Sequence, residues 1–284
     1  MFIWLASYPK SGNTLVRSML SSYFFSNDGI YNFDLIKNIK QFPSSKLFQL
    51  IGVDIRYERE IIKNYIEAQK FINKKDTTQF LKTHSSLFNI NGSAFTDLKN
   101  SLGVIYIVRD PRNVVTSFAN HAAISVNVAC DQLINFHHMG GDLNRLDTEK
   151  TKVYTGTWSY NYNSWKSFKS IGKYLLIKYE DLILKKEDSF LKILKFIHKL
   201  KQVKFQLNEE KFINTIKSTT FEEMKNLEIK NGFEEAKINK ETGKKIPFFN
   251  LGEKNDWKKI LDSNIRKNLE KAFKKEMVEL NYLN

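Results

Sequence analysis

The chemistry that this sequence offers starts with Lys10, Ser11 and Thr14, which surround Gly12 near the N-terminus. An ammonium group beside hydroxyls in so short a stretch suits an anion such as a phosphate. The apolar, aromatic-rich run of residues 2–6 precedes them, and apolar residues at helical spacing follow them. We therefore expect a strand, a loop and a helix, with the helix N-terminus adding backbone N–H groups to an anion site in the loop.

The order of residues in this loop excludes a Walker A motif, in which a Lys-Ser or Lys-Thr pair follows the second of two glycines. Lys10 instead precedes Gly12, which is the only glycine of the loop. The residue types alone also fit a simpler interpretation, a strand-loop-helix corner with a surface lysine.

A second strand-to-helix junction carries Arg109. Residues 103–108 are apolar and β-branched, which predicts a strand, and helical spacing begins after Pro111. Ser117 lies near the end of the second helical turn, and open parallel sheets bind ligands at the carboxyl ends of their strands. Arg109 and Ser117 are therefore expected to hold one anion together, whereas an Arg-Asp pair that caps the helix is the alternative.

A third expected strand, residues 80–85, carries Lys82 and His84 near its end. Side chains two residues apart point to the same face of a strand, so the ammonium and the imidazole are expected on one face. Histidine titrates near neutrality and can act as a base, although a lone histidine is more often structural.

These segments, in this order along the chain, resemble the motifs of the cytosolic-type sulfotransferases, which use 3′-phosphoadenosine 5′-phosphosulfate (PAPS) as donor. The stretch from Ser7 to Thr14 is similar to the family's 5′-phosphosulfate loop, and residues 109–117 are similar to its 3′-phosphate signature. The resemblance implies that His84 is the general base and that Lys82 contacts the donor's sulfate. The donor ligands implied at these motifs are Lys10, Ser11, Gly12, Asn13, Thr14, Arg109 and Ser117.

The resemblance continues downstream in less specific motifs. Family members line the adenine pocket with residues that correspond here to Tyr179, Thr219 and Phe221. Leu15 departs from the family, which usually has a tryptophan against the adenine at this position. Ordinary core packing is the alternative interpretation of the three adenine-pocket residues.

Residues 249–257 resemble the family's terminal cofactor loop, which implies a donor contact at Gly252. Asn250 and Leu251 stand in place of the Arg-Lys pair that normally binds the 3′-phosphate, and neither side chain carries a charge. We expect a nearby lysine to supply that charge. The candidates are Lys254, which is slightly favoured, and the pair Lys244-Lys245.

The expected fold is a single α/β domain over residues 1–284, with a parallel β-sheet flanked by helices and a P-loop-like strand-loop-helix at the anion site. A chain of 284 residues with 42% hydrophobic content can bury a sizeable core, and no Pro/Gly-rich linker or repeat divides it. Apolar residues at helical spacing predict the core faces of three helices, which include Trp158, Phe190 and Ile265. The last of these helices is expected to start at Asp262 or Ser263.

Composition narrows the function classes. The net charge of +14 favours an anionic partner, but no nucleic-acid-binding signature accompanies it. His137-His138 and Asp142 could suggest a metal site, but no further ligand lies at a standard spacing, so no metal is expected. Cys130 is the single cysteine, which excludes an intramolecular disulfide, and no apolar run is long enough for a membrane helix. Pro9-Lys10 interrupts the N-terminal apolar stretch before it is long enough for a signal peptide. The expected location is therefore cytoplasmic.

We therefore predict a PAPS-dependent sulfotransferase that moves a sulfuryl group in line to a hydroxyl, or an amine, of a small-molecule, lipid or sugar acceptor, leaving adenosine 3′,5′-bisphosphate (PAP). Lys10 and Lys82 are expected to stabilise the charge on the transferring group. A P-loop-like kinase for a nucleoside or small alcohol is the alternative, and a non-catalytic nucleotide or nucleic-acid binder is a third. The acceptor pocket is expected in residues 30–78, 122–152 and 227–247.

Overall fold

The computed structural model describes residues 1–73, 79–135, 138–139, 151–239 and 242–283. The chain packs into two compact units, each assembled from three separate stretches. The first unit comprises residues 1–8, 39–108 and 136–205, and the second comprises residues 9–38, 109–135 and 206–284.

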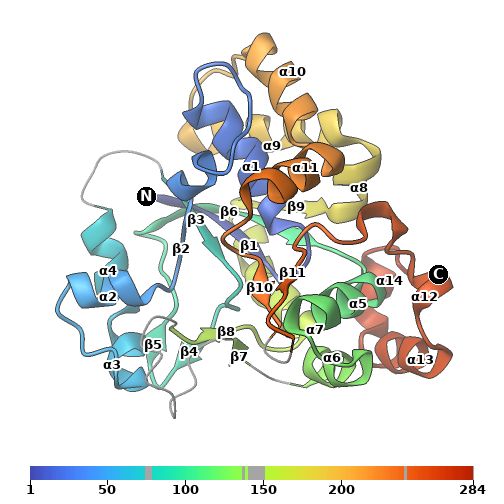
Figure 1. The fold of residues 1–284 in the computed structure, drawn as a ribbon. Coiled ribbons are helices and arrows are strands. Elements are labelled where there is room, and N and C mark those ends of the chain that lie inside the picture. The colour runs from blue at the N-terminus through green and yellow to red at the C-terminus, as the bar shows by residue number, and fades with distance from the viewer. Residues whose placement is uncertain (74–78, 136–137, 140–150, 240–241, 284) are drawn as a thin grey trace. The chain divides into compact units, whose positions relative to one another are not determined.

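A five-stranded sheet forms the centre of the first unit (Figure 1). Its strand order is β2-β3-β1-β6-β9, and every neighbouring pair runs parallel. This arrangement confirms the predicted α/β class and its parallel sheet. The strands are β1 (Phe2–Ser7), β2 (Lys40–Gln41), β3 (Gln79–Thr83), β6 (Ser101–Val108) and β9 (Tyr174–Lys178).

The carboxyl ends of these strands share one edge of the sheet. Ala6, near the end of β1, pairs with Thr83, the last residue of β3. Val108 and Lys178 pair in the same way at the ends of β6 and β9. His84 directly follows β3 at this edge, which is where open parallel sheets bind ligands.

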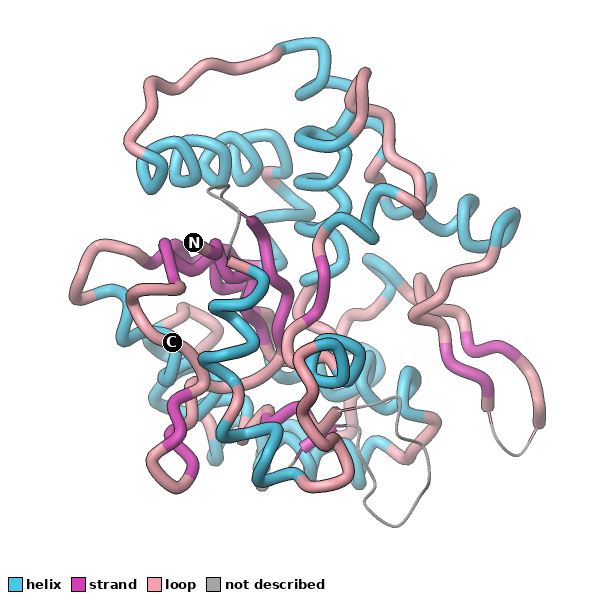
Figure 2. Tube along the Cα trace, turned by 90° about the vertical axis from the view of Figure 1, so that its left-hand side faces the viewer, coloured by secondary structure: helices cyan, strands magenta, loops and turns pink. Residues whose placement is uncertain are grey.

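Helices of the first unit cover both faces of β6. Gly103 faces helix α9 so closely that a Cβ atom at this position would lie 2.6 Å from Leu200. Tyr106 is three residues further on and therefore points to the opposite face, where its hydroxyl donates to Asn161 of α7 at 2.8 Å. Figure 2 shows the strands in magenta and the helices in cyan. The helices of this unit are α2 (Ser45–Leu50), α3 (Glu58–Lys63), α4 (Tyr65–Ile72), α7 (Trp158–Trp165), η2 (Lys166–Lys169), α8 (Tyr179–Leu184) and α9 (Lys186–Lys201).

Trp4 of β1 lies in an aromatic core in the first unit. Its ring centroid is 5.8 Å from that of Phe42, 5.4 Å from that of Phe95 and 5.9 Å from that of Trp165. Its indole Nε1 donates to Ser101 Oγ at 2.8 Å, so the polar atom of the buried ring is paired. The predicted core faces of α7 and α9 are confirmed, since the buried residues include Trp158, Tyr162, Trp165, Phe190, Ile193, Leu194 and Ile197.

The second unit is mostly helical. Helix α1 packs on η1 and α10, and α5 packs on α6, α12 and α13. The predicted start of the C-terminal core helix is confirmed, because Asp262 caps α13 by accepting from the N–H groups of Asn264 at 2.8 Å and Ile265 at 3.3 Å. The elements are α1 (Asn13–Phe25), η1 (Leu35–Asn38), α5 (Pro111–Ala122), α6 (Val126–Ile134), α10 (Glu209–Ser218), α11 (Phe221–Asn231), β10 (Lys237–Ile238), β11 (Lys245–Ile246), η3 (Gly252–Lys254), α12 (Trp257–Ile260), α13 (Ser263–Ala272) and α14 (Lys274–Glu279).

Short antiparallel hairpins complete both units. The first unit holds β4 (Asn89–Ile90) with β5 (Ser93–Ala94), and β7 (His138–Met139) with β8 (Val153–Tyr154). In the second unit β10 pairs with β11. Among the described residues, none of the helices has the length and apolar content needed to cross a bilayer.

Candidate active site

The loop between β1 and α1 has the conformation of an anion-binding turn. Lys10 has φ 64° and Gly12, the N-cap of α1, has φ 100°, both in the left-handed region. Left-handed residues in such a loop turn successive backbone N–H groups toward one side, which favours a bound anion. The predicted strand, loop and helix are confirmed, and α1 ends at Phe25.

Lys10 sits in a desolvated position within the second unit. Its Nζ lies 3.9 Å from the centroid of the Phe248 ring, a cation–π contact. Burial lowers the pKa of Lys10 to about 8, with the charge of Glu235 acting to raise it and that of Arg109 to lower it further. A bound anion would restore the charged form of this lysine, which is the arrangement expected of a residue that holds a phosphate or sulfate group.

The loop hydroxyls differ in their partners. Ser11 is fully buried, and its Oγ makes no hydrogen bond with any residue in the described part of the chain. Thr14 is half-buried, and its Oγ1 donates to Glu235 Oε2 at 3.3 Å. Since a buried hydroxyl without a partner is costly, Ser11 marks a point in the loop where a ligand oxygen would be stabilised.

Glu235 is a site residue that the sequence did not indicate. Its second carboxylate oxygen, Oε1, lies 2.5 Å from Arg17 Nη1, on the next turn of α1 after Thr14. The Arg17 side chain is 7% exposed and that of Glu235 is 34% exposed. Glu235 falls in the stretch 227–247, which carries none of the predicted donor motifs, and it lies 218 residues away from Arg17 in the sequence.

Arg109 and Lys10, from two different motifs, meet in the second unit. The buried Arg109 guanidinium donates from Nη1 to the carbonyl oxygen of Lys10 at 3.3 Å. Ser117 lies half-buried on α5, the helix that begins two residues after Arg109. Arg109 and Ser117, the predicted 3′-phosphate ligands, thus lie just before α5 and on α5. Arg109 also contacts the loop that carries the predicted 5′-phosphate ligands.

The terminal loop is fastened to α5. Trp257 donates its backbone N–H to Asn113 Oδ1 at 3.0 Å, and Asn255 donates from Nδ2 to the Asn113 carbonyl at 2.9 Å. Asn255 Oδ1 also accepts from Thr116 Oγ1 at 2.6 Å. The loop that resembles the family's terminal cofactor loop therefore lies on the helix that carries Ser117.

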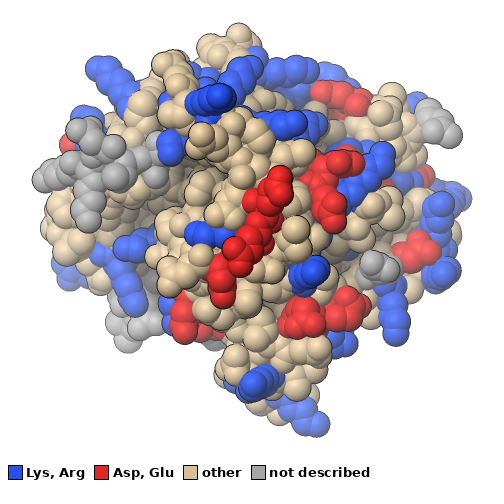
Figure 3. Space-filling view, turned by 90° about the horizontal axis from the view of Figure 1, so that it is seen from above, with Lys and Arg blue, Asp and Glu red and all other residues tan. Residues whose placement is uncertain are grey.

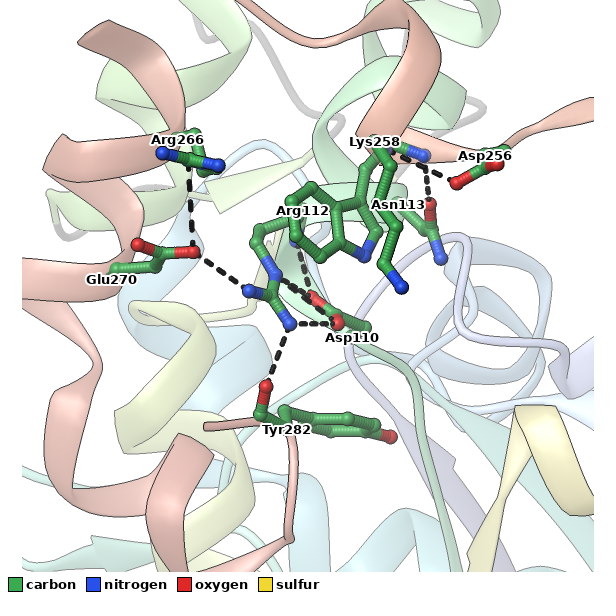
Figure 4. Close-up of polar contacts among 9 residues, drawn as sticks. Asp110, Arg112, Asn113, Asp256, Lys258, Arg266, Glu270 and Tyr282 are labelled. Carbon is green, nitrogen blue, oxygen red and sulfur yellow. Dashed lines mark hydrogen bonds and ion pairs between the residues drawn. The ribbon is translucent and has the colours of Figure 1, made fainter. Parts of the chain in front are cut away.

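Arg112 joins this loop to the C-terminal helices (Figure 4). Its guanidinium lies 3.8 Å from the Trp257 ring centroid, donates to Asp110 through Nε and Nη2, and pairs with Glu270 at 2.7 Å. Nη2 also donates to the carbonyl oxygen of Tyr282 at 2.7 Å. Each of these contacts is charge-assisted or desolvated. Arg112 therefore links the start of α5 to the terminal loop and to the C-terminal helices.

The remaining predicted donor contacts of the second unit are Phe221, Gly252, Thr219 and Lys254. Phe221 and Gly252 touch, because a Cβ atom at Gly252 would lie 2.7 Å from the Phe221 ring, and Gly252 has φ +56°. Thr219 is buried, and its hydroxyl donates to the carbonyl oxygen of Thr215 at 2.6 Å. Lys254 is exposed on η3, so its predicted contact with a 3′-phosphate stays a prediction.

Lys82 and His84 belong to the first unit. Lys82 is buried on β3 and donates from Nζ to Gln41 Oε1 at 2.6 Å. The predicted strand 80–85 ends earlier, at Thr83, because the Thr83 hydroxyl accepts from the N–H of Ser85 at 3.0 Å and turns the chain away from the ladder. His84 therefore lies one residue beyond the strand.

Backbone groups orient His84. Its Nδ1 lies 2.9 Å from the carbonyl oxygen of Ser7 and 3.2 Å from the Ser7 hydroxyl. A carbonyl only accepts, so Nδ1 carries the proton in the tautomer that makes this bond, and Nε2 then holds the lone pair of a base. Asn161 donates to the carbonyl oxygen of His84 at 2.9 Å and accepts from Tyr106, which fixes the backbone on the other side. The sequence did not indicate Asn161, which lies on the predicted core helix α7.

Tyr179 and the histidine pair complete the predicted residues. Tyr179 is half-buried and is the first residue of α8, directly after β9. His138 lies on β7, whereas His137 and Asp142 lie outside the described residues. In the described parts of the chain, the His, Cys, Asp and Glu side chains form no group of three that would hold a metal ion.

Comparison with known proteins identifies the family of the chain. The sulfotransferase domain family matches residues 2–281, so the chain belongs to the sulfotransferase family, and the predicted resemblance is confirmed. The chain is 25% identical to luciferin sulfotransferase of Photinus pyralis over 231 residues, which are 79% of this chain but only 56% of that relative. It is 26% identical to amine sulfotransferase of Oryctolagus cuniculus over 280 residues, with 97% and 80% of the two chains covered.

Solved structures share the fold at low identity. A mouse sulfotransferase complexed with PAP matches with a TM-score of 0.58 and 19% identity, covering 97% of this chain and 84% of that chain. Retinol dehydratase in complex with androsterone and PAP matches with a TM-score of 0.58 and 16% identity, covering 97% and 80%. These likenesses support the predicted α/β fold with its P-loop-like turn.

Proposed function

We propose that this protein is a PAPS-dependent sulfotransferase that works as one domain over residues 1–284. The observation that carries the proposal is a desolvated Lys10 beside a buried Ser11 hydroxyl that has no hydrogen-bond partner among the described residues. Both lie in a left-handed loop that Arg109 contacts at 3.3 Å. Positive charge, a hydroxyl donor and turned N–H groups in one loop suit the phosphosulfate of the donor.

In the proposed reaction the acceptor oxygen or nitrogen attacks the donor's sulfur in line. His84 Nε2 takes the acceptor's proton as the new bond to sulfur forms, while the bond between sulfur and the bridging phosphate oxygen breaks. Lys10 and Lys82 stabilise the negative charge on the transferring group and on the leaving phosphate oxygen. PAP leaves as the second product, and His84 holds the proton from the acceptor. The transfer changes no oxidation state, and no step of it is assigned to a metal.

The donor is proposed to lie along the predicted residues. Ser11, Gly12, Asn13 and Thr14 hold the 5′-phosphate, and Arg109 and Ser117 hold the 3′-phosphate. Tyr179, Thr219 and Phe221 line the adenine, with Gly252 and Lys254 beside the 3′-phosphate. Relatives solved with PAP support this choice of nucleotide.

The acceptor is proposed to be a small molecule that carries a hydroxyl or an amine. Luciferin sulfotransferase and amine sulfotransferase, by their names, act on such compounds, and retinol dehydratase has been solved with androsterone. The acceptor pocket is proposed to draw on residues 30–78, 122–152 and 227–247. We also propose a cytoplasmic location, because a chain with a single cysteine suits a reducing compartment.

Nucleic-acid binding finds little support in the surface charge. Figure 3 shows lysine and arginine side chains in blue spread over one face, with acidic side chains in red among them, rather than one basic stripe. The cations on this face are therefore dispersed, whereas a recognition module gathers its cations along one element.

A thermal-shift comparison of PAP, ATP, AMP and sulfate tests the proposal. A ligand at a hundred times its dissociation constant adds about 2.7 kcal/mol to the free energy of unfolding. We expect a clear shift with PAP and little with AMP, followed by sulfated product when PAPS is incubated with a panel of phenols, alcohols and amines. An equal response to PAP and ATP, with turnover that needs Mg²⁺ and ATP, would instead identify a kinase.

A further inference from the structure

The segment that follows α11 contacts the anion loop at two separate points within the second unit. Glu235 reaches Thr14 and Arg17 on the first turns of α1. Phe248, on the other side of the β10–β11 hairpin, covers the Lys10 ammonium at 3.9 Å. One continuous stretch of chain thus touches both the helix end and the lysine of the loop.

This stretch is held in place by contacts of its own. The Glu228 carboxylate accepts from the backbone N–H groups of Phe248 at 2.7 Å and Phe249 at 2.9 Å. Phe233 and Phe249 are buried in a hydrophobic cluster with Met224 of α11. Residues before and after Glu235 in the sequence, Phe233 and Phe249, are thus packed or hydrogen-bonded, so the segment that carries Glu235 is held in place on both sides.

The Glu235 carboxylate occupies positions that suit a donor anion. Its two oxygens contact the Thr14 hydroxyl and the Arg17 guanidinium, near the N-terminus of α1, where the helix dipole favours negative charge. Thr14 is also one of the residues proposed to bind the 5′-phosphate. Two anions that share one hydroxyl lie within a few ångströms of each other, where their repulsion is strong.

We propose that Glu235 is an internal competitor for the donor's 5′-phosphate, so that donor binding displaces its carboxylate from Thr14. This inference rests on the proposed function, since it assigns regulation to the same donor site. The carboxylate lowers donor affinity, and the release of Glu235 couples nucleotide binding to movement of the segment that carries Phe248. The Lys10 ammonium then exchanges an aromatic contact for an anionic one.

Binding titrations of three nucleotides to three forms of the full chain test the inference. The variants are Glu235→Gln, which removes the charge at nearly constant shape, and the control Glu234→Gln, which removes the neighbouring charge. Glu234 is the adjacent residue, is 79% exposed and pairs with Lys37 at 3.2 Å. It therefore controls for the loss of one negative charge in this segment, whereas Glu235 contacts Thr14 and Arg17. The probes are PAP, AMP and adenosine 3′-phosphate.

We expect Glu235→Gln to bind PAP and AMP about tenfold more tightly than the unaltered chain, because both carry a 5′-phosphate. Adenosine 3′-phosphate lacks that group, so its affinity should change by less than about twofold. Glu234→Gln should match the unaltered chain with all three nucleotides. Glu235→Ala, which also lacks the charge, repeats the test if the glutamine variant folds poorly.

Equal or weaker PAP binding by both Glu235 variants would overturn the inference, because Glu235 would then support the donor site rather than compete for it. A gain of equal size with adenosine 3′-phosphate would also overturn it, since the effect would then be a general change in charge. Failure of PAP to bind the unaltered chain and the variants alike would instead remove the proposed function, and the inference with it.

Discussion

Arg109 donates a hydrogen bond from its guanidinium to the carbonyl oxygen of Lys10 at 3.3 Å, across 99 residues of sequence. The lysine belongs to the loop after β1, and the arginine follows β6. The two motifs therefore meet in the second unit. We propose that a nucleotide with phosphates on both its 3′ and 5′ positions binds across them, with Arg109 neutralising part of its charge.

Arg109→Ala should weaken PAP binding by about tenfold or more and leave AMP affinity almost unchanged. The reason is that a charge-assisted hydrogen bond to the 3′-phosphate contributes about 1.5–3 kcal/mol, and AMP lacks this phosphate. Calorimetric titration of both nucleotides measures the difference. If AMP loses affinity by the same factor, Arg109 acts by holding the Lys10 loop instead of the 3′-phosphate.

His84→Ala should reduce sulfuryl transfer by 10²–10⁴-fold, roughly 3–5 kcal/mol of transition-state stabilisation, and leave PAP binding within about threefold. The Ser7 carbonyl oxygen, 2.9 Å from Nδ1, favours the tautomer in which Nε2 is the basic atom. Steady-state turnover and PAP titration of the variant check both parts. His198→Ala, on α9 with its Nδ1 2.8 Å from the Leu194 carbonyl oxygen, is the control and should keep its activity.

The donor affinity should fall as pH rises through about 8. Burial lowers the pKa of Lys10 to about 8, so above this pH the free protein holds a neutral amine, and anion binding must take up a proton. The PAP phosphates are already ionised above neutral pH, so their own titration adds little. Titrations between neutral and alkaline pH should approach about a tenfold loss per pH unit.

Lys10→Arg is the matched variant for this pH effect. The guanidinium stays charged throughout the alkaline range, so the loss of affinity with rising pH should become shallow. A pH profile of Lys10→Arg as steep as that of the unaltered chain would assign the proton to another group.

Lys254→Ala should weaken PAP binding by a smaller factor than Arg109→Ala, with AMP again unchanged. Asn250 and Leu251 carry no charge at the positions of the usual Arg-Lys pair, and Lys254 lies on η3 in the same loop. Lys259→Ala, which removes an exposed lysine from the neighbouring α12, should bind both nucleotides normally. If Lys254→Ala and the double Lys244→Ala, Lys245→Ala variant both bind PAP normally, this loop supplies no cation.

Arg112→Ala should lower the free energy of unfolding by about 3–5 kcal/mol, because it removes the guanidinium that neutralises the buried Asp110 carboxylate. Arg266→Ala is the control, since Arg266 also pairs with Glu270 but is 43% exposed and 4.0 Å away. It should cost about 1 kcal/mol or less. Denaturant unfolding of both variants measures the difference. Equal decreases in the free energy of unfolding would show that the buried Arg112–Asp110 pair stabilises the protein no more than the exposed Arg266–Glu270 pair.

The strands and the loop were predictable because their signals are local. The apolar run at residues 2–6 and the helical spacing after Gly12 gave β1 and α1 to within one residue. Strand β2, with two residues, is too short to show any periodicity. The end of β3 depends on a side chain, the Thr83 hydroxyl, that competes with the ladder for the N–H of Ser85.

The site was predictable only where a motif is continuous in sequence. Arg109 directly follows β6, and Lys10 and Ser11 lie three and four residues after the end of β1, so their placement needs little more than the order of elements. Glu235 contacts Thr14 across 221 residues, and Asn161 contacts the His84 carbonyl across 77. Both depend on tertiary packing, which leaves no pattern in the neighbouring residues.

The carbonyl oxygen that accepts from His84 belongs to the main chain at Ser7. Every amino acid supplies the same carbonyl, so no single substitution at this position deletes the group that sets the imidazole's proton. Where a carboxylate side chain does this work, one mutation is enough to lose it. A substitution of Ser7 therefore keeps the main-chain acceptor that orients His84, although it removes the hydroxyl that lies 3.2 Å from the same ring nitrogen.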